Sequence, residues 1–178
     1  ERVLQQMKDA GVTPNEVTYN TLMAAYVQAK DTKAAERVLQ QMKDAGVTPN
    51  EVTYNTLMAA YVQAKDTKAA ERVLQQMKDA GVTPNEVTFS TLMAAYVQAK
   101  DTKAAERVLQ QMKDAGVTPN EVTFSTLMAA YVQAKDTKAA ERVLQQMKDA
   151  GVTPDEVTFS TLMAAYVQAK DTKAAERV

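Results

Sequence analysis

The chain has 178 residues and no Cys, His or Trp, and its 21 Lys and Arg nearly balance its 22 Asp and Glu to give a net charge of −1. This composition excludes zinc fingers, disulfide bonds, thiol nucleophiles and imidazole bases, and the neutral balance argues against bulk electrostatic attachment to nucleic acid or anionic lipid. No apolar run approaches the roughly 20 residues of a membrane-spanning helix. We therefore expect no membrane partner, no catalytic residue, no metal site and no cofactor.

Glycine and proline each recur every 35 residues along the whole chain, at Gly11, Gly46, Gly81, Gly116 and Gly151 and at Pro14, Pro49, Pro84, Pro119 and Pro154. A fixed period of this size indicates a solenoid, in which each unit buries its apolar face against its neighbours. We expect one continuous array over residues 1–178, with full repeats at 16–50, 51–85, 86–120 and 121–155 and partial repeats at 1–15 and 156–178.

Three positions of the repeat vary, and the rest are identical in every copy. Tyr19 and Tyr54 correspond to Phe89, Phe124 and Phe159; Asn20 and Asn55 correspond to Ser90, Ser125 and Ser160; Asn15, Asn50, Asn85 and Asn120 correspond to Asp155. Natural duplication leaves scattered drift at tolerant surface positions. Surface positions that are identical in every copy, with differences confined to three positions, therefore indicate a designed consensus array.

The first helix of each repeat, called helix A, is predicted from Glu16 to about Ala29. Pro14 suits a helix start, Asn15 or Thr13 can cap the first amides, and Thr13 has capping-box spacing to Glu16. One side of the helix is apolar at helical spacing, through Tyr19, Leu22, Tyr26 and Ala29.

The second helix, called helix B, is predicted from about Lys33 to Ala45. Asp31 is its expected cap, and Gly46 is the expected left-handed residue after its end. Its apolar face is expected to be buried and consists of Ala34, Ala35, Val38, Leu39 and Met42. The sequence therefore predicts an all-α protein, an α-solenoid of 35-residue helix-turn-helix repeats.

Helix A also has a second stripe, formed by Val17, Asn20, Ala24 and Gln28 at about 100° per residue. This stripe is small and uncharged, whereas a solvated face usually has Lys and Glu, as helix B does. Repeated along a solenoid, such a stripe is expected to line a concave groove that a ligand can enter.

The residues Val17-Thr18-Tyr19-Asn20-Thr21-Leu22, the Ala-rich second helix and the run Gln41-Met42-Lys43 ahead of Gly46-Val47-Thr48-Pro49-Asn50 resemble the pentatricopeptide repeat. The resemblance covers the whole chain. It implies a right-handed superhelix that binds single-stranded RNA, one base per repeat.

The resemblance also implies the site. A polar residue early in helix A and the last residue of the same repeat would read one base, and this pair is called a module below. The modules are Asn20 with Asn50, Asn55 with Asn85, Ser90 with Asn120 and Ser125 with Asp155, and Ser160 stands without a partner. The bases would pack against Val17, Val52, Val87, Val122 and Val157. In the family's code the modules read 5′-CCAG-3′ parallel to the chain, followed by a purine at Ser160.

Other interpretations stay open at this point. The chain could be a ligand-free structural scaffold or a peptide-binding helical repeat, and Asn50 and its equivalents could be simple helix caps. The stripe ends in a neutral residue at Gln28, Gln63, Gln98, Gln133 and Gln168, so we expect weak RNA binding with a shallow salt dependence. The chain is expected to begin and end inside helix B, which favours head-to-tail stacking through uncapped ends and a window on a longer array. No residue pattern gives a cellular address.

Overall fold

The computed structural model describes residues 2–176, and all the regular elements in this range are helices. Glu1, Arg177 and Val178, which belong to the two expected partial repeats, lie outside the described residues. In chain order the helices are α1 (Arg2–Asp9), α2 (Glu16–Gln28), α3 (Thr32–Asp44), α4 (Glu51–Gln63), α5 (Thr67–Asp79), α6 (Glu86–Gln98), α7 (Thr102–Asp114), α8 (Glu121–Gln133), α9 (Thr137–Asp149), α10 (Glu156–Gln168) and α11 (Thr172–Ala175). The even-numbered helices are the A helices of the repeats.

Each A helix begins directly after the last residue of the preceding repeat, which serves as its N-cap. Asn15 has an extended backbone, and its side chain accepts a hydrogen bond from the backbone N–H of Thr18 while the Thr18 hydroxyl accepts from the Asn15 N–H. This reciprocal pair is a capping box. The expected box between Thr13 and Glu16 is wrong, because the chain enters the helix two residues later than that spacing requires.

Both helices of a repeat end in the same hydrogen-bonded turn. After α3, the Gly46 N–H donates to the Lys43 carbonyl at 3.0 Å and the Val47 N–H to the Met42 carbonyl at 2.9 Å. This is the Schellman pattern, with Gly46 at φ 71° as predicted. After α2 the same turn has Lys30 in the left-handed position at φ 57°.

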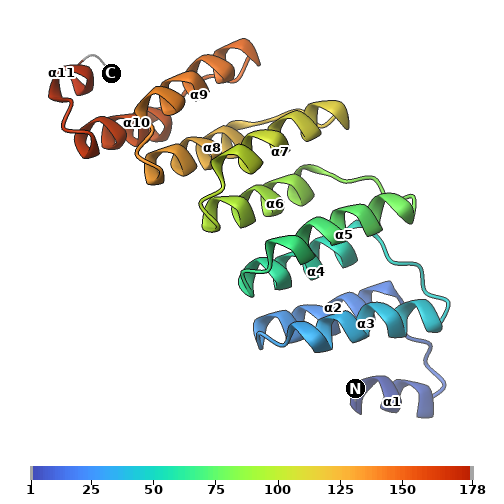
Figure 1. The fold of residues 1–178 in the computed structure, drawn as a ribbon. Helices are drawn as coiled ribbons and strands as arrows, with labels where there is room; N and C mark the ends of the chain where they lie inside the picture. Colours follow the sequence, from blue (N-terminus) through green and yellow to red (C-terminus); the bar gives the residue numbers. More distant parts are fainter. Residues whose placement is uncertain (1, 177–178) are drawn as a thin grey trace. The chain divides into compact units, whose positions relative to one another are not determined.

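The chain divides into two compact units, residues 1–84 and 85–178, and within each unit the helices form two layers. In the first unit α2 packs on α3 and α4 on α5, while α4 also contacts α2 and α3. In the second unit α8 contacts α6, α7, α9 and α10 (Figure 1). Within each unit, therefore, successive A helices form one layer and the B helices the other. Each unit is a stretch of all-α solenoid, and a single continuous array stays a prediction.

The core lies between the layers and is built from the predicted apolar faces. Helix B buries all five expected residues, Ala34, Ala35, Val38, Leu39 and Met42. In helix A, Tyr19 and Met23 are buried, but Ala29 is exposed, contrary to its predicted place on the apolar side. Ala29 is the C-cap of α2, where the backbone leaves the layer. None of the described helices has the length and apolar character that a bilayer span requires.

Candidate functional site

Helix α8, the N-cap Asp155 and the N-terminal half of α10 line an open groove of about 500 Å³, called the α8–α10 groove. It contains the predicted module Ser125 and Asp155 together with both flanking valines, Val122 and Val157. Its lining consists of Glu121, Val122, Ser125, Thr126, Ala129, Asp155, Val157 and Thr161. The contact between A helices therefore brings one complete predicted reading set to a single open surface.

The five predicted packing valines lie in the first turn of their A helices and are exposed. Their exposed fractions are 64% for Val17, 54% for Val52, 57% for Val87, 58% for Val122 and 59% for Val157. Isolated exposed valines are ordinary. An exposed valine at the same place in every A helix, beside a groove, supplies a regular row of apolar contact points.

In the first unit the predicted module Asn20 and Asn50 is in direct contact. The Asn20 amide Nδ2 donates to Asn50 Oδ1 at 3.2 Å. Asn50 Oδ1 also accepts from the backbone N–H of Thr53 at 3.1 Å, because Asn50 is the N-cap of α4. The Thr53 hydroxyl donates to Asn20 Oδ1 at 2.7 Å. Helix capping and module geometry are therefore parts of one hydrogen-bond network.

Capping also decides which atom the last residue of a module can offer to a ligand. A backbone N–H only donates, so the atom of Asn50 that faces it is the oxygen, and the Asn50 NH₂ group is directed away from the helix. In Asp155 one carboxylate oxygen accepts from the Thr158 N–H and hydroxyl, each at 2.8 Å. These hydrogen bonds lower the pKa of Asp155 below its usual 3.8, so at neutral pH its other oxygen is an acceptor only.

The module Ser90 and Asn120 is linked in a different way. Asn120 caps α8 through Thr123, and its amide Nδ2 donates to a carboxylate oxygen of Glu86, at the start of the helix that bears Ser90. Ser90, Asn120 and Ser125 are half-buried, and Asp155 and Ser160 are exposed. Asn55 lies in α4 and Asn85 caps α6; because these two residues belong to different units, their pairing stays a prediction.

The groove has little positive charge. None of the residues that line it, all within the described part of the chain, is Lys or Arg, and two are the acidic residues Glu121 and Asp155. The Gln28 position at the end of the stripe is exposed in every A helix. Among residues 2–176, no cluster of three or more His, Cys, Asp or Glu is placed to hold a metal ion.

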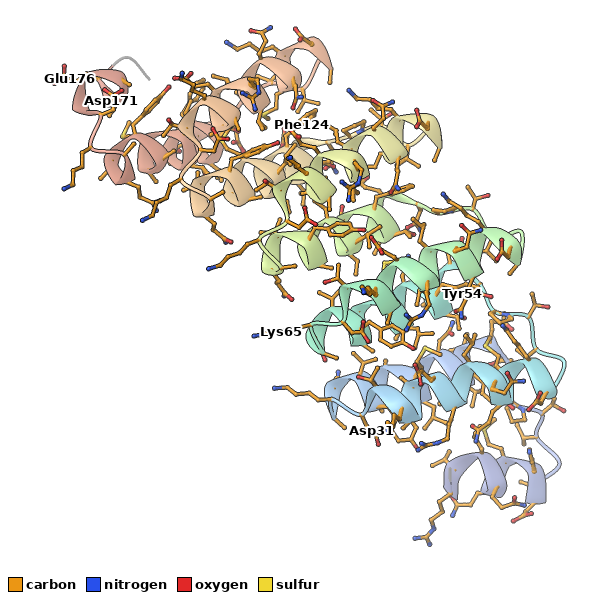
Figure 2. The ribbon with its side chains drawn as sticks, viewed as in Figure 1. Asp31, Tyr54, Lys65, Phe124, Asp171 and Glu176 are labelled. Atoms are coloured by element: carbon orange, nitrogen blue, oxygen red, sulfur yellow. The ribbon has the colours of Figure 1, made fainter. Side chains whose placement is uncertain are left out.

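The third variable position, next to the helix A reader, lies in the core at Tyr19, Tyr54, Phe89 and Phe124 and is half-buried at Phe159. Tyr54, Phe89 and Phe124 each have no exposed surface, and Figure 2 labels Tyr54 and Phe124. The Tyr54 hydroxyl is buried without a hydrogen-bond partner, and burial raises its pKa. Phenylalanine fills the same space without that unpaired hydroxyl. The structure does not explain why Tyr accompanies Asn.

Two kinds of residue at this site were not predicted from the sequence. Thr53 and its equivalents bond to the module residues, and Glu86 contacts Asn120. Neither varies between copies, so comparison of the repeats gives no signal. The spacing from Asn50 to Thr53, which is that of an N-cap to its third helical residue, could have identified the threonines.

The comparisons with known proteins agree with this architecture. The sequence matches the pentatricopeptide repeat domain over residues 2–63 and the PPR repeat family over residues 49–96, 86–132 and 122–168. This chain belongs to the pentatricopeptide repeat family. No curated protein matches it significantly.

Solved pentatricopeptide repeat structures resemble the chain along most of its length. The crystal structure of PPR10 from maize has a TM-score of 0.86 and 30% identity, covering 97% of this chain and 25% of PPR10. PPR10 in complex with an 18-nt psaJ RNA element has a TM-score of 0.79 and 29% identity, covering 97% of this chain and 26% of that one. The PPR domain of Arabidopsis thaliana protein-only RNase P 1 in complex with tRNA, at 21% identity and a TM-score of 0.74, shares the fold and covers 91% and 86%. The chain thus spans about a quarter of the length of PPR10.

Proposed function

We propose that this chain is a designed scaffold that binds single-stranded RNA in a sequence-specific way, with one base per repeat. The observation that carries the proposal is the coincidence of variation and geometry. Two of the three variable positions meet beside exposed valines, at Asn20 with Asn50 and at Ser125 with Asp155. PPR10, which resembles the chain, has been crystallised with an RNA element.

The hydrogen-bond network favours cytosine at the module Asn20 and Asn50. The Asn50 oxygen accepts from the Thr53 N–H and from the Asn20 amide, and the Asn20 oxygen accepts from the Thr53 hydroxyl, so the module offers N–H donors outward. Cytosine has two adjacent acceptors, N3 and O2, on its Watson–Crick edge. Uracil has an N–H at the ring position that would face the Asn50 NH₂, so two donors would meet without an acceptor.

The two modules that lie entirely in the second unit, Ser90 with Asn120 and Ser125 with Asp155, also pair the free donor or acceptor of the capping residue with a complementary base edge. Asn120 caps α8 through its oxygen, which accepts from the Thr123 N–H. One hydrogen of its NH₂ group is bonded to Glu86, and the other suits the acceptor N1 of adenine, while the short Ser90 leaves room for a purine. Asp155 offers an acceptor, which suits the N1–H and amino group of guanine. With Asn55 and Asn85 as a second cytosine module, the expected site is 5′-CCAG-3′, followed by a purine at Ser160.

A binding titration tests the proposal with the intact chain. We expect a fluorescently labelled RNA containing CCAG to bind more tightly than a scrambled RNA and than the equivalent DNA, which lacks the 2′-hydroxyl. Equal affinity for all three would reject base reading.

Two substitutions use the chain's own modules as templates. Ser90→Asn converts the third module to the type of the first and should shift its preference from adenine to cytosine. Asp155→Asn converts the fourth module to the type of the third and should shift guanine to adenine. Each variant should change the preference at its own base alone, so an unchanged preference in a folded variant contradicts the assignment.

A further inference from the structure

The third residue of the A helix is a threonine whose side chain is directed into the protein. Its exposed fraction is 0% for Thr53 and Thr88 and 1% for Thr123 and Thr158. A buried hydroxyl needs a hydrogen-bond partner. In each of these repeats the hydroxyl lies within 2.8 to 3.1 Å of the side-chain oxygen of the preceding repeat's last residue.

The neighbouring threonine on the same helix behaves differently. The Thr56 hydroxyl donates to the carbonyl of Val52 at 2.7 Å, the usual bond of a helical threonine to the preceding turn. The Thr53 hydroxyl instead accepts from the Asn50 N–H at 3.1 Å and donates toward Asn20 Oδ1 at 2.7 Å. Thr53 thus contacts both residues of a module that belongs to the repeat before it.

We propose that Thr53 is a positioning residue for base reading by Asn20 and Asn50, and that Thr88 and Thr123 have the same role for the modules that end at Asn85 and Asn120. The proposal rests on the proposed function. Being buried, the threonine does not touch the base. It acts by fixing the side-chain orientation of the residues that do.

The physical reason is that an asparagine amide has two different ends. Without the Thr53 hydroxyl, the backbone N–H of residue 53 still holds Asn50 Oδ1, but Asn20 Oδ1 loses its donor at 2.7 Å. The Asn20 amide is then held by the remaining 3.2 Å hydrogen bond from its Nδ2 to Asn50 Oδ1, so it rotates more readily and can present its oxygen instead of its NH₂ group. A reading surface that offered only donors becomes one that also accepts, and the distinction between cytosine and uracil weakens.

The same argument ranks the modules. Thr53 holds two amides, so its loss should have the largest effect. Thr123 supplements the backbone N–H that holds Asn120, so its loss should have a smaller effect. Thr158 contacts Asp155, whose two carboxylate oxygens are equivalent, so rotation changes nothing and the guanine preference should persist.

The test measures a ratio of affinities in the full chain carrying Thr53→Val. Each protein is titrated with RNAs containing CCAG and UCAG, which differ at the first base, and with CCAG and CCCG, which differ at the third. For Thr53→Val we expect the cytosine preference at the first base to fall by about tenfold, which corresponds to one net hydrogen bond of about 1.4 kcal/mol. If the wild-type preference is less than tenfold, it should disappear. The adenine preference at the third base should not change.

Two variants serve as controls. Thr56→Val removes a hydroxyl from the same helix, one turn away and bonded to backbone, and should leave both ratios unchanged. Thr53→Ser restores the hydroxyl and should restore the cytosine preference. Circular dichroism checks that each variant is folded. If Thr53→Val is not, Thr53→Ala replaces it at the first base, and Thr123→Val should give a smaller loss of the adenine preference at the third.

The outcomes separate the two proposals. A folded Thr53→Val that keeps the wild-type ratio, including one that loses affinity equally for every RNA, overturns the positioning role and leaves the proposed function intact. A wild-type chain without base preference overturns the proposed function, and this inference with it.

Discussion

At the scale of single residues, the two tyrosines of α4 have hydroxyl groups in opposite situations. Tyr54 is buried and its hydroxyl has no partner. The Tyr61 hydroxyl donates to a carboxylate oxygen of Glu36 on α3, and Tyr166 is bonded to Glu141 in the same way. Each of these two tyrosine–glutamate hydrogen bonds connects an A helix to the B helix of the preceding repeat. Glu36 belongs to the charged face of helix B, which the sequence indicates is solvated, and this contact is not predicted.

Tyr→Phe should therefore change stability in opposite directions at these two positions. Tyr54→Phe removes an unpaired buried hydroxyl and should raise the unfolding free energy by about 1 kcal/mol, whereas Tyr61→Phe removes a bonded one and should lower it by about 0.5–1.5 kcal/mol. Chemical denaturation followed by circular dichroism measures both. The reverse change Phe89→Tyr serves as the check, and should destabilise; a stabilising result there would contradict the explanation.

Asp155 makes the stability of its repeat depend on acid pH. Its hydrogen bonds to Thr158 lower its folded-state pKa below 3.8. A lowered carboxyl pKa contributes stability that is complete above the unfolded pKa and is lost as the pH falls through the folded one. Relative to Asp155→Asn, which has the residue of the other copies, the wild type should lose stability as the pH falls below 3.8. A carboxyl NMR titration measures the pKa directly, and a value above 3.8 would refute the effect.

At the scale of helices, the two C-terminal turns of each repeat share a geometry but not a residue. Gly46 and its equivalents have φ of 70–73°, and a β-carbon at these positions would meet no atom within 4 Å, so glycine is required by backbone conformation and not by space. The A helices have lysine in the same conformation, as at Lys65 with φ 56°, in the turn between α4 and α5 (Figure 2). A left-handed conformation costs a non-glycine residue roughly 1–2 kcal/mol.

Lys65→Gly should consequently stabilise the protein. The relief of backbone strain should outweigh the free-energy cost of the more flexible unfolded chain. The unfolding free energy should therefore rise by about 0.5 kcal/mol or more. Lys68→Gly, three residues later in the first turn of α5, is the matched control and should destabilise by up to about 1 kcal/mol. Thermal denaturation of the two variants should give melting temperatures on opposite sides of the wild type. A decrease for both would show that Lys65 is not strained.

The sequence predicts helices well here because each has its own start and stop signals. Asp31 and Gly46 fix helix B, and the Asn15 side chain fixes the start of helix A. The left-handed Lys30 could not be anticipated, since the rule for such positions favours glycine. In the candidate site, Asn20 and Asn50 are predicted from the family resemblance, and both positions also vary between copies. Thr53 and Glu86 are invariant, and their roles depend on contacts between helices about 30 residues apart in the chain, which periodicity does not reveal.

At the scale of the whole molecule, charge is balanced overall but not at the groove. The chain has a net charge of −1, yet every A helix begins with a glutamate, and Glu121 lines the α8–α10 groove. The negative charges of these glutamates stabilise the N-terminal ends of the helices. They also repel phosphate, whose contacts with cationic side chains normally dominate nucleic-acid affinity.

Replacing Glu16, Glu51, Glu86, Glu121 and Glu156 together by Gln should tighten RNA binding several-fold at low salt, with less gain at high salt because the effect is electrostatic. The helices should lose some stability. Changing Asp9, Asp44, Asp79, Asp114 and Asp149 to Asn raises the net charge equally, but in the B helices, and is the matched control. Equal tightening by both sets would show that net charge matters and the groove does not.

The N-cap that completes each module gives a practical boundary for recombination. In the proposed function, specificity for one nucleotide would begin in one repeat and end three residues into the next, so a cassette cut between Asn50 and Glu51 would lack part of its reading network. Every copy resumes with the same tripeptide Glu-Val-Thr, at 16–18, 51–53, 86–88, 121–123 and 156–158. Because any cassette meets the same continuation, cassettes can be shuffled in any order without redesigning their junctions.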